Sequence, residues 1–289
     1  MKYRMLAVDL DGTLLNRQGQ VSSSNLDAVQ RAIEAGLRIV PCTGRAWCEC
    51  RDVLANFPVS PLSDTGVFVT GAAISDLTTG KTLDTSAIEP HLVLDLVEHL
   101  WDLPEAILVF RDGNQVHHDY LVTGSGSLAP NTQWWFDRTG AKVHRLDRVG
   151  IDDLHHTLRV GLVAIGHRIP PTLDGVRQSF AGQVEIQHFQ AVQTPDPDQI
   201  VHILEVFAAG VDKWRGLTWI AQKQGIEPEQ IAAIGDEIND VSMLQHVGCG
   251  IAMDGAADVT RAVARHVTLG CDDHGVAHAI NMLLEGEWG

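Results

Sequence analysis

The chain has 289 residues with 37 Asp and Glu against 21 Lys and Arg, which gives a formal net charge of −16. Hydrophobic residues make up 45% of it and proline only 11 positions, so a disordered or collagen-like chain is excluded. This length suggests about two domains. The acidic balance disfavours nucleic acid as a partner, because a phosphate backbone is bound by a basic surface. A small anionic substrate then requires a local cationic site.

The sequence indicates a cytoplasmic protein with no membrane partner. No apolar run approaches the roughly 20 residues that a membrane-spanning helix needs. The chain also reaches Asp9 and Asp11 before an apolar signal-peptide region can form. The cysteines are odd in number and lack the paired spacing of a zinc site, so we expect them to be reduced. They are Cys42, Cys48, Cys50, Cys249 and Cys271.

The first stretch of the chain alternates strands with a helix. Apolar runs at 4–10, 37–42 and 66–74 predict three strands. Between the first two, the serines at 22–24 can cap a helix whose apolar side chains fall on one face and which stops at Gly36. This alternation is typical of a parallel sheet with helices on both faces.

Between about 83 and 208 the pattern changes to paired strands with few helices. Residues 106–110 and 115–122 predict a hairpin around Asp112, Gly113 and Asn114. We also expect helices at 91–101 and 171–181, with strands at 158–165, 184–189 and 202–207. We interpret residues 83–208 as an α+β cap domain, inserted into a core that residues 1–82 and 209–289 form together.

After the insert the parallel pattern resumes. The expected elements are a helix from Trp214, a strand at 231–235, a helix from Asp240, a strand at 249–253 and short helices near 256–264 and 276–284. The predicted fold class is therefore α/β, with a doubly wound, Rossmann-like parallel-sheet core and an inserted α+β cap.

Asp9 and Asp11 lie where the first predicted strand ends, in the sequence Asp-Leu-Asp-Gly-Thr. Carboxylates two residues apart leave a strand on the same face, and the carboxyl ends of parallel strands border the ligand crevice of such sheets. Two close carboxylates repel, so either a cation lies between them or one pKa is raised. A metal favours Asp9 as ligand and nucleophile, and a raised pKa suits Asp11 for acid–base chemistry. A surface turn is the alternative for this pentapeptide alone.

A second acidic pair follows a later strand. Asp236 comes directly after the apolar run 231–235, and Asp240 lies four residues further on, about one helical turn away. Several carboxylates at one point need a hard divalent cation, and oxygen ligands that leave room for water and phosphate favour Mg²⁺. An acidic helix start would explain Asp240 alone, but not an Asp directly after a buried strand.

The cationic side of the crevice is predicted from Thr43, Gly44 and Lys213. A hydroxyl and backbone N–H groups at a helix start form an anion site. Lys213 lies at a helix start, where a cation is slightly unfavourable against the helix dipole, which hints at another role. A helix N-cap is an equally good interpretation of Thr43 alone, and a solvated side chain is the ordinary interpretation of Lys213.

Together these segments resemble the haloacid dehalogenase superfamily of aspartyl phosphotransferases. The four motifs of that superfamily correspond to Asp9–Thr13, Thr43-Gly44, Lys213 and residues 235–240. Each follows or adjoins a strand end of one sheet, and their order is that of the family. The position of the insert, between the second and third motifs, is similar to that of the Cof-like subfamily of sugar-phosphate phosphatases.

The resemblance implies a role for each catalytic residue. Asp9 attacks the phosphorus and forms an aspartyl phosphate. Asp11 protonates the leaving alcohol and then deprotonates the water that hydrolyses the intermediate. Thr43 and Lys213 hold the phosphoryl oxygens, and Lys213 also offsets the charge of Asp9.

The resemblance also implies a cofactor and further phosphate contacts. Mg²⁺ is bound by the Asp9 side chain, the Asp11 backbone carbonyl and Asp236, with Asp240 supporting these ligands. The residues implied to bind phosphate or substrate are Gly44, Arg45 and Asn239. Asn239 either contacts the phosphoryl group or orders Lys213, and Arg45 either faces a substrate or pairs with a carboxylate.

The chain departs from the subfamily beside this set. It has Thr70-Gly71-Ala72 where relatives usually carry Asn-Gly-Ala, and Asp254-Gly255-Ala256 where they carry Gly-Asn-Ala. Lys213 is followed by Trp214 where glycine is common. These changes keep the catalytic residues and alter the wall beside them, so they bear on the substrate more than on the reaction class.

We therefore predict a Mg²⁺-dependent phosphatase of small phosphorylated metabolites, with sugar phosphates as the expected substrates, acting as a monomer or homodimer. One alternative is a phosphohexomutase of the phosphomannomutase kind, which returns the phosphoryl group to the sugar instead of to water. Assays of phosphate release and of isomer interconversion separate the two. A further alternative is a binding or regulatory module without turnover, which is expected to lack Asp9, Asp11 or Lys213, although this chain keeps all three.

Overall fold

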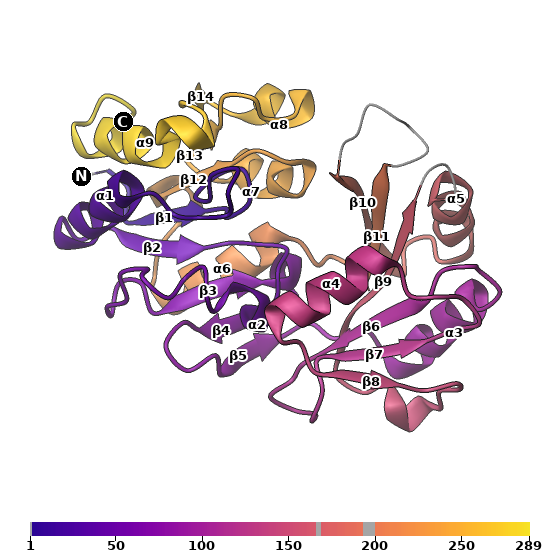
Figure 1. Ribbon diagram of the computed structural model, residues 1–289. Coiled ribbons are helices and arrows are strands. Elements are labelled where there is room, and N and C mark those ends of the chain that lie inside the picture. The colour runs from indigo at the N-terminus through magenta and orange to yellow at the C-terminus, as the bar shows by residue number, and fades with distance from the viewer. Residues whose placement is uncertain (1, 166–168, 193–199) are drawn as a thin grey trace. The chain divides into compact units, whose positions relative to one another are not determined.

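The computed structural model describes residues 2–165, 169–192 and 200–289, and the chain divides into two units. The first unit comprises Met1–Asp84 and Asp212–Gly289, and the second comprises Thr85–Val211. In Figure 1 the first unit accordingly contains both the indigo beginning and the yellow end of the chain. The second unit is an insertion into the first along the sequence.

A five-stranded parallel sheet forms the centre of the first unit (Figure 1). Its strands, in spatial order, are β14 (His266–Val267), β13 (Cys249–Ala252), β12 (Ile231–Gly235), β1 (Met5–Val8) and β2 (Arg38–Pro41). The register places Val8 opposite Ile234 on one side and Pro41 on the other. The three central strands are buried along their whole length, as in a sheet covered on both faces. The predicted α/β parallel core is confirmed.

Two of the helices of this unit begin at a side-chain cap. The helices are α1 (Ser23–Glu34), α2 (Trp47–Cys50), α6 (Lys213–Lys223), α7 (Val241–His246), α8 (Asp258–Val263) and α9 (Gly275–Leu284). Ser22 caps α1 by accepting the N–H of Asn25, and Asp212 caps α6 by accepting the N–H of Arg215 at 2.7 Å. The apolar face of α6, including Leu217, packs into the core formed by the strands and α7.

An ion pair joins the two points at which the chain leaves and re-enters the first unit. Asp84 lies at the end of this unit's first segment, and Arg215 lies in the first turn of α6. Arg215 Nη2 is 2.6 Å from Asp84 Oδ2, and Arg215 Nη1 donates to the carbonyl of Gly71 at 3.2 Å. The guanidinium therefore fixes the end of the first segment beside the start of α6, where the second segment begins.

The prediction of a single strand at 66–74 in the parallel sheet is wrong. The segment forms β3 (Thr65–Phe68) and β4 (Ala73–Asp76), which pair antiparallel and join β5 (Thr82–Thr85) in a separate sheet. A 3-10 turn, Val69–Gly71, separates them. The turn is buried beside α6, so its apolar residues continue the pattern of a strand although the chain reverses.

The second unit is built on a six-stranded sheet that is antiparallel except where β7 and β8 pair. In spatial order its strands are β10 (Val184–Val192), β11 (Val201–Ala208), β9 (Thr157–Ile165), β6 (Ile107–Arg111), β7 (Tyr120–Thr123) and β8 (Val143–Arg145). Helices α3 (Pro90–Leu100) and α5 (Ile169–Ser179) pack their apolar residues into one core with the sheet. The predicted α+β character and the β6–β7 hairpin are confirmed.

One helix of this unit was not predicted. Helix α4 (Pro130–Thr139) buries only Thr132 and Phe136, so its sequence lacks a clear apolar stripe. The ring of Phe136 lies 4.8 Å from that of Tyr120, centroid to centroid, and fixes the helix to the sheet of the same unit. Across the described residues of both units, every helix is too short or too polar to cross a bilayer.

A half-buried histidine contact predicts that the second unit loses stability in acid. Arg111 Nη1 donates to His118 Nε2 at 3.0 Å, which requires a neutral imidazole with its proton on Nδ1. Burial, Arg111 and His144 lower the pKa of His118, and Asp119 opposes them. Because the folded-state pKa lies below the unfolded value, the unfolded chain binds more protons as the pH falls below about 6.5.

We therefore expect His118 to contribute a loss of stability between about pH 6.5 and pH 5.5, the range below the unfolded pKa of histidine. Asp9 and Asp236, whose folded-state pKa values are raised, add stability over the same range, so the contribution of His118 is the difference between a His118 variant and the wild type. Replacing His118 with Gln keeps an acceptor for Arg111 without a titrating group, so His118→Gln should lose less stability over this range. His91→Gln, at an exposed position of α3, is the matched control. Thermal melts in a pH series measure the effect. An unchanged pH dependence in His118→Gln contradicts this account.

Candidate active site

Three carboxylates converge at the carboxyl edge of the parallel sheet. Asp9 follows β1 and Asp236 follows β12, and the Asp9 N–H continues the pairing of these strands by donating to Ile234 O at 3.0 Å. Carboxylate oxygens of Asp9, Asp236 and Asp240 all lie within 4.8 Å of one another. Parallel pairing places neighbouring strand ends at one edge, which is why residues more than 200 positions apart meet here.

Lys213 lies buried between two of these carboxylates. Its Nζ is 2.6 Å from Asp9 Oδ1 and 2.6 Å from Asp240 Oδ1. The lysine and Asp240 are 0% exposed and Asp9 is 4% exposed. Charges at such depth are compatible with a stable fold only when they are paired and hydrogen bonded. Since Lys213 is the first residue of α6, the start of that helix determines where its ammonium lies.

Burial and repulsion set the ionisation of this cluster. Burial raises the pKa of Asp9 well above its usual range; Lys213 lowers it, and Asp240 and Asp236 raise it further. Burial disfavours the charge of Lys213, but Asp240 and Asp9 outweigh that effect and raise its pKa. Burial and Asp240 raise the pKa of Asp236 to about 7. Lys213 therefore offsets only part of the burial and mutual repulsion that raise the pKa values of these carboxyl groups.

Asp240 orders both the lysine and the loop after β12. Its Oδ1 binds Lys213, and its Oδ2 accepts the backbone N–H groups of Asp236 at 3.0 Å and Glu237 at 3.1 Å. The Asp240 side chain, which makes all three contacts, is fully buried. The Asp240 carboxylate thus connects Lys213, the third predicted motif, to the loop of residues 235–240, the fourth.

The turn after β1 determines where the carboxylate of Asp236 lies. The Leu14 N–H returns to Asp9 O at 3.2 Å, and Gly12 adopts a φ of +73° within the turn. A β-carbon at Gly12 would lie 2.2 Å from Asp236 Oδ2, so only glycine fits there. Thr13 Oγ1 donates to Asp236 Oδ1 at 2.9 Å and orients that carboxylate.

Asp11 lies apart from the buried carboxylates and faces Arg45. The Arg45 guanidinium contacts both oxygens of Asp11, with Nε 2.7 Å from Oδ2 and Nη2 against Oδ1. The side chain of Asp11 is 54% exposed, whereas that of Arg45 is mostly covered. Of the two roles considered for Arg45, the structure therefore shows the contact with a carboxylate.

The second motif forms a tight turn after β2. The Thr43 N–H donates to Val67 O at 2.9 Å, and Thr43 Oγ1 accepts the N–H of Arg45 at 3.1 Å. The hydroxyl thus closes a local turn. The alternative of a helix N-cap at Thr43 is wrong, because α2 begins at Trp47 and its N-cap is Ala46. Asn239 faces this turn, because its Nδ2 is 3.6 Å from the point that a β-carbon of Gly44 would occupy. Residues of the second and fourth motifs are therefore neighbours.

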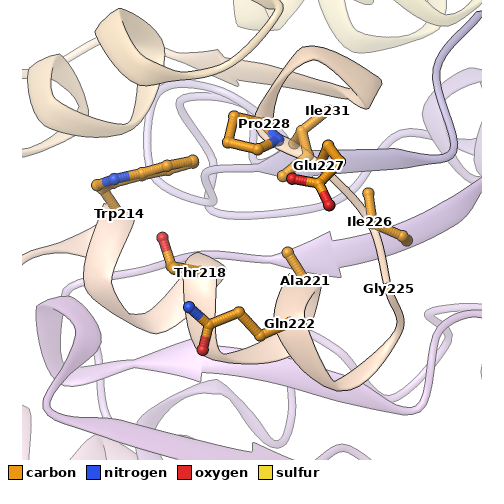
Figure 2. Close-up of a pocket in the computed structure, with 9 residues that line it drawn as sticks. All are labelled: Trp214, Thr218, Ala221, Gln222, Gly225, Ile226, Glu227, Pro228 and Ile231. Atoms are coloured by element: carbon orange, nitrogen blue, oxygen red, sulfur yellow. The ribbon is translucent and has the colours of Figure 1, made fainter.

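A pocket of about 390 Å³ in the same unit lies elsewhere (Figure 2). Its lining includes Trp214, Thr218 and Gln222 from α6, together with Ile231. Ile231 begins β12, whereas Asp236 follows the end of that strand, so the pocket opens at the amino edge of the sheet. It is distinct from the carboxylate cluster.

Two residues of the site region were not assigned a role from the sequence. Thr13 belongs to the first motif, and its place directly after Gly12 was the available signal. Thr70 was noted only as a departure from the usual Asn-Gly-Ala. Its burial and its nearness to Gly44 depend on how the β3–β4 turn packs, which the sequence does not reveal.

Comparison with known proteins identifies the family. The sequence profile of the haloacid dehalogenase-like hydrolases matches residues 6–152 and 183–280, which include all four predicted motifs. The chain is a haloacid dehalogenase-like hydrolase. The resemblance inferred from the order of the motifs is confirmed.

This haloacid dehalogenase-like hydrolase is similar over its whole length to named phosphatases. It is 29% identical to the 5-amino-6-(5-phospho-D-ribitylamino)uracil phosphatase YwtE of Bacillus subtilis, with 99% of each chain covered. It is 26% identical to the pyridoxal phosphate phosphatase YbhA of Escherichia coli, over 92% of this chain and 93% of the relative. The HAD subclass IIB sugar phosphatase BT4131 shares its fold, with a TM-score of 0.76, 21% identity and coverage of 98% and 99%. The hydrolase is thus a phosphoric monoesterase of the Cof-like type.

Because the Lys213 ammonium is buried between two carboxylates, we expect its removal to destabilise the fold strongly. Lys213→Met leaves Asp9 and Asp240 buried without their partner, so we expect the free energy of unfolding to fall by about 3–5 kcal/mol. Chemical denaturation of the purified variant measures this loss. Lys223→Met, which removes an exposed lysine from the other end of α6, is the matched control. Equal stability of the two variants contradicts the assigned role of the pair.

Proposed function

We propose that this hydrolase is a Mg²⁺-dependent phosphatase that cleaves small phosphorylated metabolites through an aspartyl-phosphate intermediate. The observation that carries the proposal is the buried Asp9–Lys213–Asp240 contact with Asp236 beside it. A carboxylate held by a lysine and placed near further acidic groups is suited to attack a phosphorus atom.

In the first step a carboxylate oxygen of Asp9 forms a bond to phosphorus while the ester P–O bond breaks. Asp11 donates a proton to the departing alkoxide, which leaves as the alcohol. The ammonium of Lys213 stabilises charge on the phosphoryl oxygens without further reorganisation, because Asp9 and Asp240 already hold it in place. The step also requires Arg45 to release one oxygen of Asp11, because the oxygen that carries the proton has to face the alkoxide.

In the second step water replaces the carboxylate on phosphorus. Asp11, now ionised, takes a proton from the attacking water. The bond between phosphorus and the Asp9 oxygen breaks, so inorganic phosphate leaves and Asp9 returns as a carboxylate. Each residue ends in its starting protonation state, as a repeated cycle requires.

The acidic residues fit a magnesium ion. Asp9, Asp236 and the Asp11 backbone carbonyl offer hard oxygen donors, which Mg²⁺ prefers, and Thr13 orders one oxygen of Asp236 while Asp240 fixes the loop. When bound there, Mg²⁺ supplies positive charge that polarises the phosphoryl group. The pKa values of Asp9 and Asp236 are raised, so Lys213 alone does not stabilise their charged forms, and a bound cation would do so.

The substrate class rests on the relatives. Their names specify a phosphorylated ribityl compound, pyridoxal phosphate and sugar phosphates. All are small phosphorylated molecules. We propose substrates of this class for the present chain.

Loss of the nucleophile tests the mechanism. The wild type should hydrolyse para-nitrophenyl phosphate with Mg²⁺, and Asp9→Asn should lower kcat by a factor on the order of 10⁴ or more, as expected for a covalent nucleophile. Glu237→Gln, which alters an exposed acid in the same region, should retain activity. Release of nitrophenolate gives the rate. Wild-type turnover in Asp9→Asn contradicts the aspartyl-phosphate route.

Metal binding has a readout that does not need turnover. Mg²⁺ should raise the melting temperature of the wild type, because a ligand bound only by the folded state stabilises it, by about 2.7 kcal/mol at 100 times Kd. Asp236→Asn should melt higher than the wild type without metal, since one crowded carboxylate is removed, and should lose most of the Mg²⁺ shift. Glu237→Gln should keep the shift. A full shift in Asp236→Asn contradicts the proposed ligand set.

A further inference from the structure

Two residues of the first unit that border the same turn each carry a buried polar atom without a hydrogen-bond partner among the described residues. Thr70 is 0% exposed, and its Oγ1 has no partner there; Asn239 Oδ1 is in the same condition. A buried hydroxyl without a hydrogen bond lowers stability. The Thr70 hydroxyl is therefore a hydrogen-bond donor that a bound ligand could use.

Both side chains border Gly44 in the turn after β2. A β-carbon on Gly44 would lie 3.4 Å from Thr70 Oγ1 and 3.6 Å from Asn239 Nδ2. Asn239 precedes Asp240, which binds Lys213. The hydroxyl of Thr70 therefore lies on the side of the crevice where the Thr43–Gly44 turn meets the fourth motif.

The backbone of Thr70 is held in a conformation that is rare for its residue type. Val69 and Thr70 have φ values of +50° and +55°, and both are β-branched. Their N–H groups donate to Arg45 O at 2.9 Å and to Thr43 O at 3.0 Å, so the turn after β2 holds them in place. On the other side a β-carbon on Gly71 would lie 1.9 Å from the carbonyl of Asp212, beside the start of α6. Strain maintained in this way is typical of functional positions.

We propose that Thr70 is a catalytic residue whose hydroxyl donates a hydrogen bond to a non-bridging oxygen of the phosphoryl group, beside the Asn239 amide. The inference rests on the proposed phosphatase function. An O–H group and an N–H₂ group bordering the same turn suit an oxygen that only accepts hydrogen bonds, and a phosphoryl oxygen is such an acceptor. Binding of the ligand thereby satisfies the buried hydroxyl.

The test compares Thr70→Val with Thr70→Ser. Valine keeps the shape and β-branching, and Val69 already adopts nearly the same φ, so the backbone should be retained. Losing a hydrogen bond to a charged oxygen should lower kcat/KM for para-nitrophenyl phosphate by about 10- to 100-fold and weaken competitive inhibition by inorganic phosphate. Thr70→Ser should remain within about threefold of the wild type, because it keeps the donor.

Thr218→Val is the matched control. Thr218 Oγ1 is likewise buried without a partner among the described residues, but it belongs to the pocket at the amino edge of the sheet (Figure 2). Its removal should leave both constants unchanged, and thermal melts show whether each variant folds. Wild-type constants in Thr70→Val overturn the proposal, as does an equal loss in Thr70→Val and Thr70→Ser.

The outcomes separate this inference from the proposed function. If the wild type hydrolyses para-nitrophenyl phosphate and Thr70→Val matches it, Thr70 is not catalytic and the function stands. If the wild type hydrolyses no ester, the function fails. Titration calorimetry with inorganic phosphate then decides on Thr70, since weaker binding in Thr70→Val supports its contact with phosphate and equal binding rules it out.

Discussion

The contact of the Lys213 ammonium with Asp9 and Asp240 is the interaction on which the site depends. It joins the end of β1, the start of α6 and the loop after β12, which are distant in sequence. All three groups are buried, so each charge is tolerated only while the others are present. The arrangement of the sheet edge and the ionisation of Asp9 therefore have the same physical basis.

The parts of the fold that could be predicted are those with a local signal. Strands such as β12 are short apolar runs, and parallel pairing brings their ends to one edge, so Asp9 and Asp236 could be placed together from spacing alone. Pairing of Arg45 with a carboxylate was one of two predicted roles, but that Asp11 is the partner could not be predicted, because it depends on how two loops approach in space. The reversal at Val69–Gly71 was missed for a similar reason, since burial against α6 gives a turn the composition of a strand.

A net charge of −16 describes the whole surface and says little about the crevice. Inside the sheet edge the field is set by a few groups at short range, where burial strengthens each interaction. Lys213 makes that place less negative than its count of carboxylates suggests, and the proposed cation would reverse the balance. Composition therefore limits the size of an anionic partner without excluding a phosphate.

The ion pair of Arg215 with Asp84 bears on how such a chain is assembled from parts. It pins together the two ends between which the second unit is inserted, using only residues of the first unit. The entropy of closing a loop between fixed ends grows only slowly with the length of the loop. For the first unit, the entropic cost of closing the chain around an insert of this size is thus only slightly larger than the cost for a short insert. Loop closure therefore sets little limit on the length of the inserted segment while the framework of the first unit stays the same.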